Sequence, residues 1–145
     1  MVGLCWTAAG GDVFVVEASR MPGAGALVLT GRLGEVMQES AQVALSWLRA
    51  HAERYGVDPA FPRDTDVHLH AQSSDVPKTG ASAGVTMETA MVSAFTGRPV
   101  RAGLAMTGEI TLSGHVLSVG AVRDKVLTAH RCGLTRVILP EGNRG

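Results

Sequence analysis

The 145-residue sequence lacks the features that mark membrane and secreted proteins. Its apolar runs, such as Val13-Phe14-Val15-Val16, are far shorter than the ~20 residues of a membrane-spanning helix. No basic segment followed by an apolar one marks a secretory leader. The two cysteines, Cys5 and Cys132, form neither a CxxC motif nor a disulfide framework. We therefore expect a cytoplasmic protein in a reducing compartment, without membrane contact.

The sequence also has no excess of charge and few aromatic residues. Acidic and basic side chains balance at thirteen each, and the six aromatic residues are scattered. Neither an electrostatic footprint nor a stacking platform for nucleic acid is present. No G-x-x-x-x-G-K-[ST] motif exists, which excludes nucleotide binding through a P-loop. Apolar residues make up 46%, enough for the core of one domain over residues 1–145.

The hydrophobic periodicity predicts an α+β fold, a mixed layered domain with the element order β-β-β-α-β-α-β-β-α-β. The expected strands cover residues 4–7, 13–17, 26–30, 66–70, 104–111, 115–119 and 136–139, and the expected helices cover 34–55, 82–95 and 121–132. On the last helix, Val122, Val126 and Ala129 mark the expected buried stripe.

The segment Gly80-Ala81-Ser82-Ala83-Gly84 puts a serine between small residues where a loop enters a helix. Small neighbours let a substrate backbone approach closely, and N–H groups at a helix start can stabilise an oxyanion. The alternative is that Ser82 is an ordinary helix N-cap. The segment also fits the G-x-S-x-G nucleophile elbow. That hydrolase triad is disfavoured because Asp124 and His130 lie about 120° apart on one helix.

Lysine is scarce, with only Lys78 and Lys125 beside eleven arginines. Unlike arginine, a lysine can lose its proton when it is desolvated and can then serve as a general base for serine. We expect Lys125 to lie beside the buried stripe of its helix, where partial burial lowers the pKa of an amine. The alternative is a surface lysine whose stem packs on the protein. Lys78, in an expected loop, is the weaker candidate.

Four further polar residues are candidates for supporting roles. Thr107 either faces solvent or orients the amine of the lysine, and Glu17 is either an exposed strand residue or part of a site. His68 and His70 share one face of a strand. They lack a third ligand of clear spacing, so the sequence does not predict a zinc site. The histidines are either ordinary polar-face residues or support a nearby site.

Taken together, these motifs resemble the proteolytic domain of Lon proteases, the ATP-dependent type of bacteria and mitochondria. The resemblance covers nearly the whole chain. It is carried by Gly10-Gly11-Asp12, Leu29 to Ala41, Val67 to His70, Ser82 to Met87, Met106 to Leu112, Lys125 and Ile138-Leu139-Pro140. Many motifs in the same order make the resemblance specific.

The resemblance implies a Ser–Lys dyad in a serine endopeptidase domain. Ser82 would be the nucleophile, Lys125 the general base and Thr107 the support of its amine. The residues expected to line the site are Glu17, His68, His70, Gly80 and Ala81. The alternative is a catalytically silent interaction or assembly module of the same fold.

The resemblance also implies a fold like the second domain of a ribosomal small-subunit protein. It implies a homohexameric ring that degrades unfolded, misfolded or regulatory proteins. No cofactor is expected in this chain, since ATP and Mg²⁺ would be used by an AAA+ module that the sequence does not contain. The family continues beyond the position of Pro140 with a strand and a helix, so the chain is expected to be C-terminally truncated. Thr79, Ala81 and Ala121 depart from the Asp, Pro and Gly that the family usually has at these positions.

Overall fold

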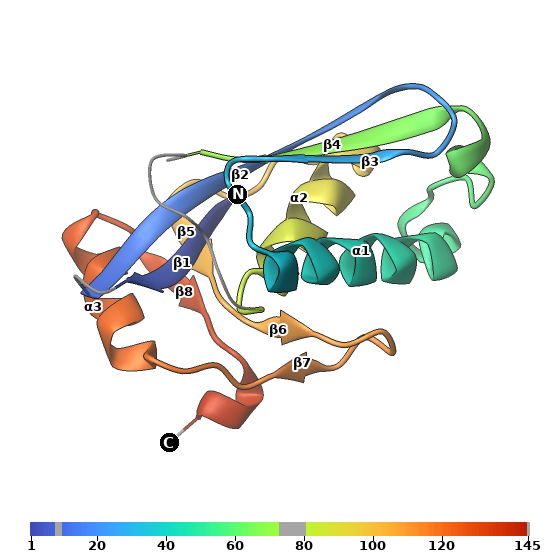
Figure 1. Ribbon diagram of the computed structural model, residues 1–145. Helices are drawn as coiled ribbons and strands as arrows, with labels where there is room; N and C mark the ends of the chain where they lie inside the picture. Colours follow the sequence, from blue (N-terminus) through green and yellow to red (C-terminus); the bar gives the residue numbers. More distant parts are fainter. Residues whose placement is uncertain (8–9, 73–80, 145) are drawn as a thin grey trace.

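The computed structural model describes residues 1–7, 10–72 and 81–144 (Figure 1). Its strands are β1 (Val2–Thr7), β2 (Gly10–Pro22), β3 (Leu27–Thr30), β4 (Thr65–Ala71), β5 (Leu104–Met106), β6 (Glu109–Ile110), β7 (Val116–Leu117) and β8 (Arg136–Ile138). Its α-helices are α1 (Glu35–Ala50), α2 (Gly84–Thr96) and α3 (Val122–Arg131). The predicted mixture of helices and strands is confirmed.

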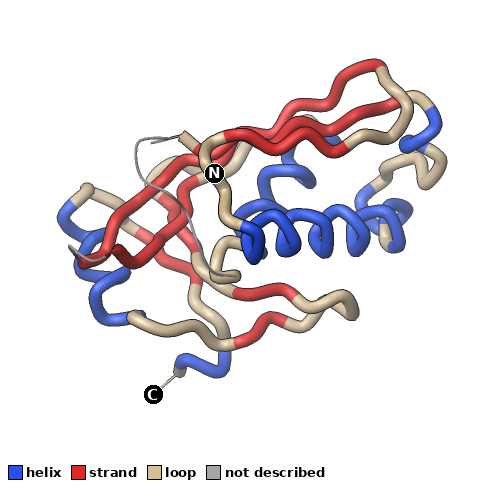
Figure 2. Tube along the Cα trace, viewed as in Figure 1, coloured by secondary structure: helices blue, strands red, loops and turns tan. Residues whose placement is uncertain are grey.

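The long strand β2 joins two halves of a six-stranded sheet in the order β3-β4-β2-β1-β5-β8 (Figure 2). Its residues 10–15 pair antiparallel with β1, and its residues 16–22 pair antiparallel with β4. The remaining pairs of this sheet, β3 with β4, β1 with β5 and β5 with β8, are parallel. Among the described strands, β2 is therefore the one that pairs with both halves.

Each half of the sheet has its own hydrophobic cluster. The larger cluster lies between the strands β2 and β4 and the helices α1 and α2, with Val67, Leu69, Leu48 and Met91 at its centre. The inward side chains of β4 alternate with polar ones, as its sequence predicts. The smaller cluster packs α3 against β1 and β5. In Figure 1, α3 accordingly lies at the opposite end of the molecule from the β3–β4 edge.

The strand expected over residues 104–111 is not continuous. β5 ends at Met106 and belongs to the large sheet, whereas β6 pairs antiparallel with β7 in a separate hairpin. Between them, the N–H of Thr107 donates to the carbonyl of Ile138, and the N–H of Gly108 donates to the carbonyl of Ser82. The chain changes its pairing partner here because the turn before α2, not a strand, accepts the hydrogen bond.

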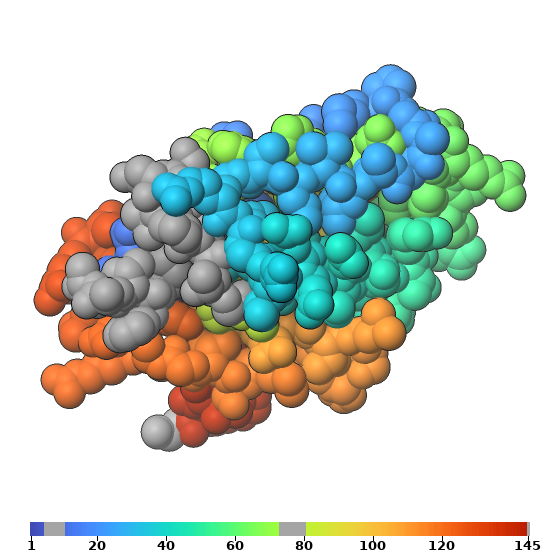
Figure 3. All heavy atoms as spheres, in the orientation of Figure 1, coloured from blue at the N-terminus to red at the C-terminus, as the bar shows by residue number. Residues whose placement is uncertain are grey.

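The β6–β7 hairpin packs beside the helices rather than extending the sheet. β6 contacts both α1 and α2, and Figure 3 shows the hairpin (orange) directly beside α1 (teal). α1 ends at Ala50 rather than at Tyr55, since residues 52–55 form a 3-10 turn. Among the helices that the structure describes, none is long and apolar enough to cross a membrane.

Candidate catalytic site

Ser82 lies in the turn immediately before α2 and is half-buried. The N-cap of α2 is Ala83, and no side chain caps the helix, so the N-cap reading of Ser82 is wrong. Its carbonyl accepts the N–H of Gly108 at 2.8 Å, and the N–H of Val85 donates back to the carbonyl of Gly108 at 3.2 Å. This reciprocal pair holds the Ser82 turn against the junction of β5 and β6.

The small residues after Ser82 serve packing of the helix against β6. A Cβ atom on Gly84 would lie 2.8 Å from the backbone nitrogen of Ile110, so only glycine lets α2 approach β6 this closely. The close approach expected for a substrate is therefore made at this position by the protein's own strand. Ala81 is half-buried beside Ser82, whereas Gly80, Thr79 and Lys78 lie outside the described residues.

The backbone donors expected at the helix start are partly engaged. The N–H of Gly84 donates to the carbonyl of Ala81 at 3.3 Å, and that of Val85 donates to Gly108. These two groups are not available to an oxyanion, which corrects the expectation of free N–H groups in the first turn of α2. Within the described part of the chain, no hydrogen bond engages the N–H of Ser82.

Lys125 lies on the inner face of α3 and is only 3% exposed. Together with Thr128 and Ala129 it forms the buried side of the helix. The expected stripe was wrong at Val126, which is 36% exposed. Because Lys125 itself occupies the stripe, it is buried more deeply than its sequence context predicts.

Thr107 connects the lysine with the serine turn. Its side chain is 1% exposed, which excludes the solvent-facing alternative. Its hydroxyl accepts a hydrogen from Nζ of Lys125 at 3.3 Å and donates to the carbonyl oxygen of Ser82 at 3.4 Å. Thr107 also sits at the junction of β5 and β6, between the two hydrophobic clusters. Ser82, Thr107 and Lys125 thus converge where the two halves of the molecule meet.

The start of β2 packs directly on the first turn of α3. A Cβ atom on Gly11 would lie 2.6 Å from the carbonyl oxygen of Asp124 and would overlap the hydroxyl of Thr128. That hydroxyl donates to the same Asp124 carbonyl at 2.8 Å. The absence of a side chain at Gly11 therefore sets how close the strand lies to the helix turn that carries Lys125.

The family model of the Lon protease (S16) C-terminal proteolytic domain matches residues 1–145. The chain belongs to this family. The resemblance predicted from the sequence motifs is thereby confirmed.

Several curated Lon proteases are close relatives of the chain. Lon protease 2 of Myxococcus xanthus is 57% identical over 96% of this chain, and Lon protease of Anaeromyxobacter dehalogenans is 55% identical over 97%. The human protein "Lon protease homolog 2, peroxisomal" is 54% identical over 98%. The chain spans only 17% of the length of each of these three relatives. Its counterpart in them is therefore one part of a much longer protein.

In this Lon-family domain, polar residues of β2, β3 and β4 form a cluster of their own. The hydroxyl of Thr30 lies 2.9 Å from Nε2 of His68 and 2.6 Å from Nδ1 of His70. Glu17 is the register partner of His70 and accepts a hydrogen bond from Gln72. The structure thus brings Glu17, His68 and His70 together.

The hydrogen bonds of the described residues keep that cluster separate from the catalytic candidates. Among the described residues, no hydrogen bond links it to Ser82, Thr107 or Lys125, and no group of three metal-ligating side chains exists. That Glu17, His68 and His70 line the catalytic site stays a prediction.

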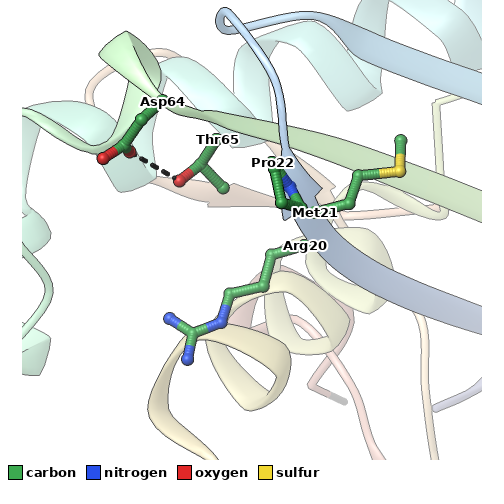
Figure 4. Close-up of a pocket in the computed structure, with 5 residues that line it drawn as sticks. All are labelled: Arg20, Met21, Pro22, Asp64 and Thr65. Carbon is green, nitrogen blue, oxygen red and sulfur yellow. Dashed lines mark hydrogen bonds between the residues drawn. The ribbon is translucent and has the colours of Figure 1, made fainter.

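A surface pocket of about 450 Å³ lies at the far end of β2 from Gly11 (Figure 4). Its lining residues are Arg20, Met21, Pro22, Asp64 and Thr65. The carboxylate of Asp64 accepts a hydrogen bond from Thr65 at 3.0 Å, and the guanidinium of Arg20 stacks on the ring of Phe95. The polar groups of this pocket have separate partners and do not point toward a common centre. The pocket is therefore a weaker candidate for a catalytic site than the region of Ser82, Thr107 and Lys125.

Sequence reasoning missed one buried charged residue, Glu88 of α2. The side chain is 8% exposed, and in the described part of the chain neither carboxylate oxygen has a hydrogen-bond partner. Burial raises the pKa of Glu88 from 4.5 to about 8. A signal existed in the sequence, since Glu88 lies on the same helical face as Met91 and Phe95 at spacings of three and seven residues.

Proposed function

We propose that the chain is a serine peptidase domain in which Ser82 is the nucleophile and Lys125 the general base. The observation that carries the proposal is the buried connection from Nζ of Lys125 through the hydroxyl of Thr107 to the turn of Ser82. A lysine removed from water and held at a hydroxyl next to a serine turn is the arrangement that Ser–Lys catalysis requires. Membership of a proteolytic-domain family supports the same reading.

In the proposed reaction, uncharged Lys125 takes the proton of Ser82 Oγ as that oxygen attacks the carbonyl carbon of the peptide bond. The tetrahedral intermediate then collapses, the C–N bond breaks, and the Lys125 ammonium gives its proton to the leaving amine. Water attacks the resulting acyl-enzyme ester with Lys125 again as base, which releases the acid and restores Ser82. Burial supports the uncharged amine, since it disfavours a charged ammonium.

The donors for the oxyanion follow from the hydrogen bonds of the turn. The N–H groups of Gly84 and Val85 are engaged within the protein. We therefore assign one donor role to the N–H of Ser82 itself, whose hydrogen-bonding capacity is unused in the described part of the chain. A backbone donor fixed in this way costs no reorganisation when the negative charge develops. The carbonyl of Ala81, which belongs to the same peptide unit as this N–H, accepts the N–H of Gly84 and keeps the peptide in place.

The role of the whole protein is part of the same proposal. We infer that it is an ATP-dependent Lon-type protease, a homohexamer that cleaves unfolded, misfolded or regulatory proteins. The use of ATP and Mg²⁺ would fall to a part of the protein outside these 145 residues. The names of the relatives support this proposal. The chain spans 17–18% of the length of these relatives. Localisation in the cytoplasm stays a prediction, and one relative is peroxisomal by name.

Covalent labelling of Ser82 tests the proposed function. An alkyl fluorophosphonate reacts with an activated serine: an O–P bond forms, fluoride leaves, and the base takes the serine proton. We expect the label on Ser82 by peptide mass spectrometry, together with hydrolysis of a fluorogenic peptide. Ser82→Ala should lose both, whereas Ser46→Ala, at an exposed serine of α1, should keep both. Hydrolysis that persists in Ser82→Ala contradicts the proposal, and the absence of both reactions in the unaltered protein favours the silent assembly module.

A further inference from the structure

The turn that leads into α3 is held by a single distant side chain. The carboxamide of Asn143, the one asparagine of the sequence, bonds both backbone groups of Val119. Its Oδ1 accepts the N–H of Val119 at 2.8 Å, and its Nδ2 donates to the carbonyl of Val119 at 2.8 Å. Asn143 lies in the short 3-10 turn Glu141–Asn143, 24 residues further along the chain.

The chemistry of the carboxamide explains why this residue is asparagine. Two residues paired across antiparallel strands exchange an N–H and a C=O in the same way. The side chain of Asn143 thus replaces a neighbouring strand for Val119, because it carries a donor and an acceptor side by side. An aspartate would keep the acceptor and lose the donor, and an alanine would lose both.

The residues after Val119 connect the backbone that Asn143 holds in place with Lys125. Ala121 is the N-cap of α3 and has φ 56° and ψ 32°, a left-handed conformation that a side chain disfavours. Such a conformation persists only where the surroundings determine it. The carbonyl of Ala121 accepts the backbone N–H of Lys125 at 3.0 Å. The orientation of the Ala121 peptide therefore sets the position of the Lys125 backbone, and with it the direction in which the lysine side chain extends from the helix.

The other contacts of the 3-10 turn are weak by comparison. Its ion pair between Glu141 and Arg144 is exposed on both sides and adds little stability. Gly142 packs against Ser118, one residue before Val119. Among the hydrogen bonds of the described residues, those of Asn143 are the ones that join this turn to the segment before α3.

We infer that Asn143 is a positioning residue for the general base: through Val119 and the left-handed Ala121 it fixes the start of α3 and so aims Lys125. The inference rests on the proposed function, in which Lys125 acts on Ser82. Asn143 touches no reacting atom. Its loss should therefore affect the chemical step more than the binding of substrate.

The variants Asn143→Ala and Asn143→Asp test the inference, with Glu141→Gln as the matched control in the same turn. The rate constant of Ser82 phosphonylation is measured from pH 6 to 10 and is divided by the fraction of folded protein. We expect the rate to fall roughly tenfold to a hundredfold in Asn143→Ala, with kcat for a peptide falling and KM nearly unchanged. The midpoint of the pH profile should move upward, toward the ~10.4 of a free lysine. Asn143→Asp should lie between, and Glu141→Gln should match the unaltered protein.

A structural role alone would lower the folded fraction and leave the corrected rate and the pH midpoint unchanged, and that result would overturn the inference. Amide hydrogen exchange gives a second readout. Protection of the Val119 and Lys125 N–H groups should fall in Asn143→Ala, which removes the acceptor of the Val119 N–H, and stay in Glu141→Gln, and equal protection in both would also overturn it. Failure of the proposed function is separate: it would appear in the unaltered protein, as Ser82 that does not react or as full reactivity in Lys125→Arg.

Discussion

Nζ of Lys125 lies 3.3 Å from the hydroxyl oxygen of Thr107, and both side chains are buried. The two residues come from α3 and from the junction of β5 and β6, 18 positions apart. The Thr107 hydroxyl in turn donates to the carbonyl of Ser82. By accepting one hydrogen of the amine, Thr107 limits the directions in which the amine's lone pair can point. This geometry leads to specific expectations for substitution.

Thr107→Val should lower kcat about tenfold, which corresponds to ~1.4 kcal/mol of transition-state stabilisation. The substitution keeps the volume and removes the acceptor that orients the amine, but the base itself remains. Thr107→Ser keeps the hydroxyl and is the matched control, with a much smaller loss. Steady-state peptide hydrolysis by the two variants provides the comparison. Equal kcat in both variants would show that the hydroxyl does not orient Lys125.

Gly11→Ala should destabilise the protein by about 1–3 kcal/mol, because the new methyl group overlaps the first turn of α3. The displaced turn carries Lys125, so peptide hydrolysis should fall as well. Gly120→Ala is the control, since a Cβ atom there would meet nothing within 4 Å. Urea unfolding measures both variants. A Gly11→Ala variant as stable as Gly120→Ala would contradict the close packing of β2 on α3.

Ala121→Gly should raise stability by about 0.5–1 kcal/mol. Glycine adopts the left-handed conformation of this position without the steric cost of a Cβ atom. We expect this gain to exceed the free-energy cost that arises because glycine has more conformational entropy in the unfolded chain. Ala102→Gly, at an exposed turn residue without positive φ, should be neutral or slightly destabilising. The urea midpoint should therefore rise for Ala121→Gly and stay the same or fall slightly for Ala102→Gly. A lower urea midpoint for Ala121→Gly would show that the left-handed backbone of Ala121 is not strained.

Glu88 should make the protein less stable as the pH rises. The folded protein keeps the proton of this carboxyl up to its raised pKa of about 8, whereas the unfolded chain releases it near 4.5. Between these values the folded state binds more protons, so the free energy of unfolding falls with increasing pH. The decrease in the free energy of unfolding is complete above pH 8. It amounts to roughly 5 kcal/mol, at about 1.4 kcal/mol per unit of the pKa shift.

Glu88→Gln removes this titration and keeps the shape of the side chain. The variant should have a higher Tm than the unaltered protein at pH 8 and nearly the same Tm at pH 5. Glu39→Gln, at an exposed glutamate of α1, should leave the pH dependence unchanged. Thermal unfolding across this pH range is the measurement. Parallel Tm curves for the unaltered protein and Glu88→Gln would refute a raised pKa for this carboxyl.

The sequence predicted the parts of the fold that repeat a simple pattern. The alternation of Val67 and Leu69 with His68 and His70 gave a correct half-buried strand, because inward and outward residues of a strand alternate. The break at Thr107 was not predicted. Its apolar neighbours continue the strand pattern, and only the hydrogen bond from Gly108 to the distant Ser82 turn ends it.

Buried polar residues were the main limit for predicting the site. The helical pattern placed Val126 inside and Lys125 at the margin, yet Lys125 is the residue that faces inward. Charged residues are assigned to solvent by default, so Glu88 was missed although its spacing to Met91 and Phe95 places it on a buried helical face. The three catalytic candidates were named from motifs alone. That they meet at Thr107 depends on contacts between segments far apart in the chain, which no local pattern contains.

The rate of peptide hydrolysis by Lys125→Arg tests the Ser–Lys reading most directly. Arginine keeps the positive charge and much of the length but stays protonated, so it cannot take the proton of Ser82. We predict a loss of at least about a thousandfold in kcat for Lys125→Arg, with the fold retained as measured by circular dichroism. Substantial peptidase activity in folded Lys125→Arg would contradict the account, because it would show that another group is the base.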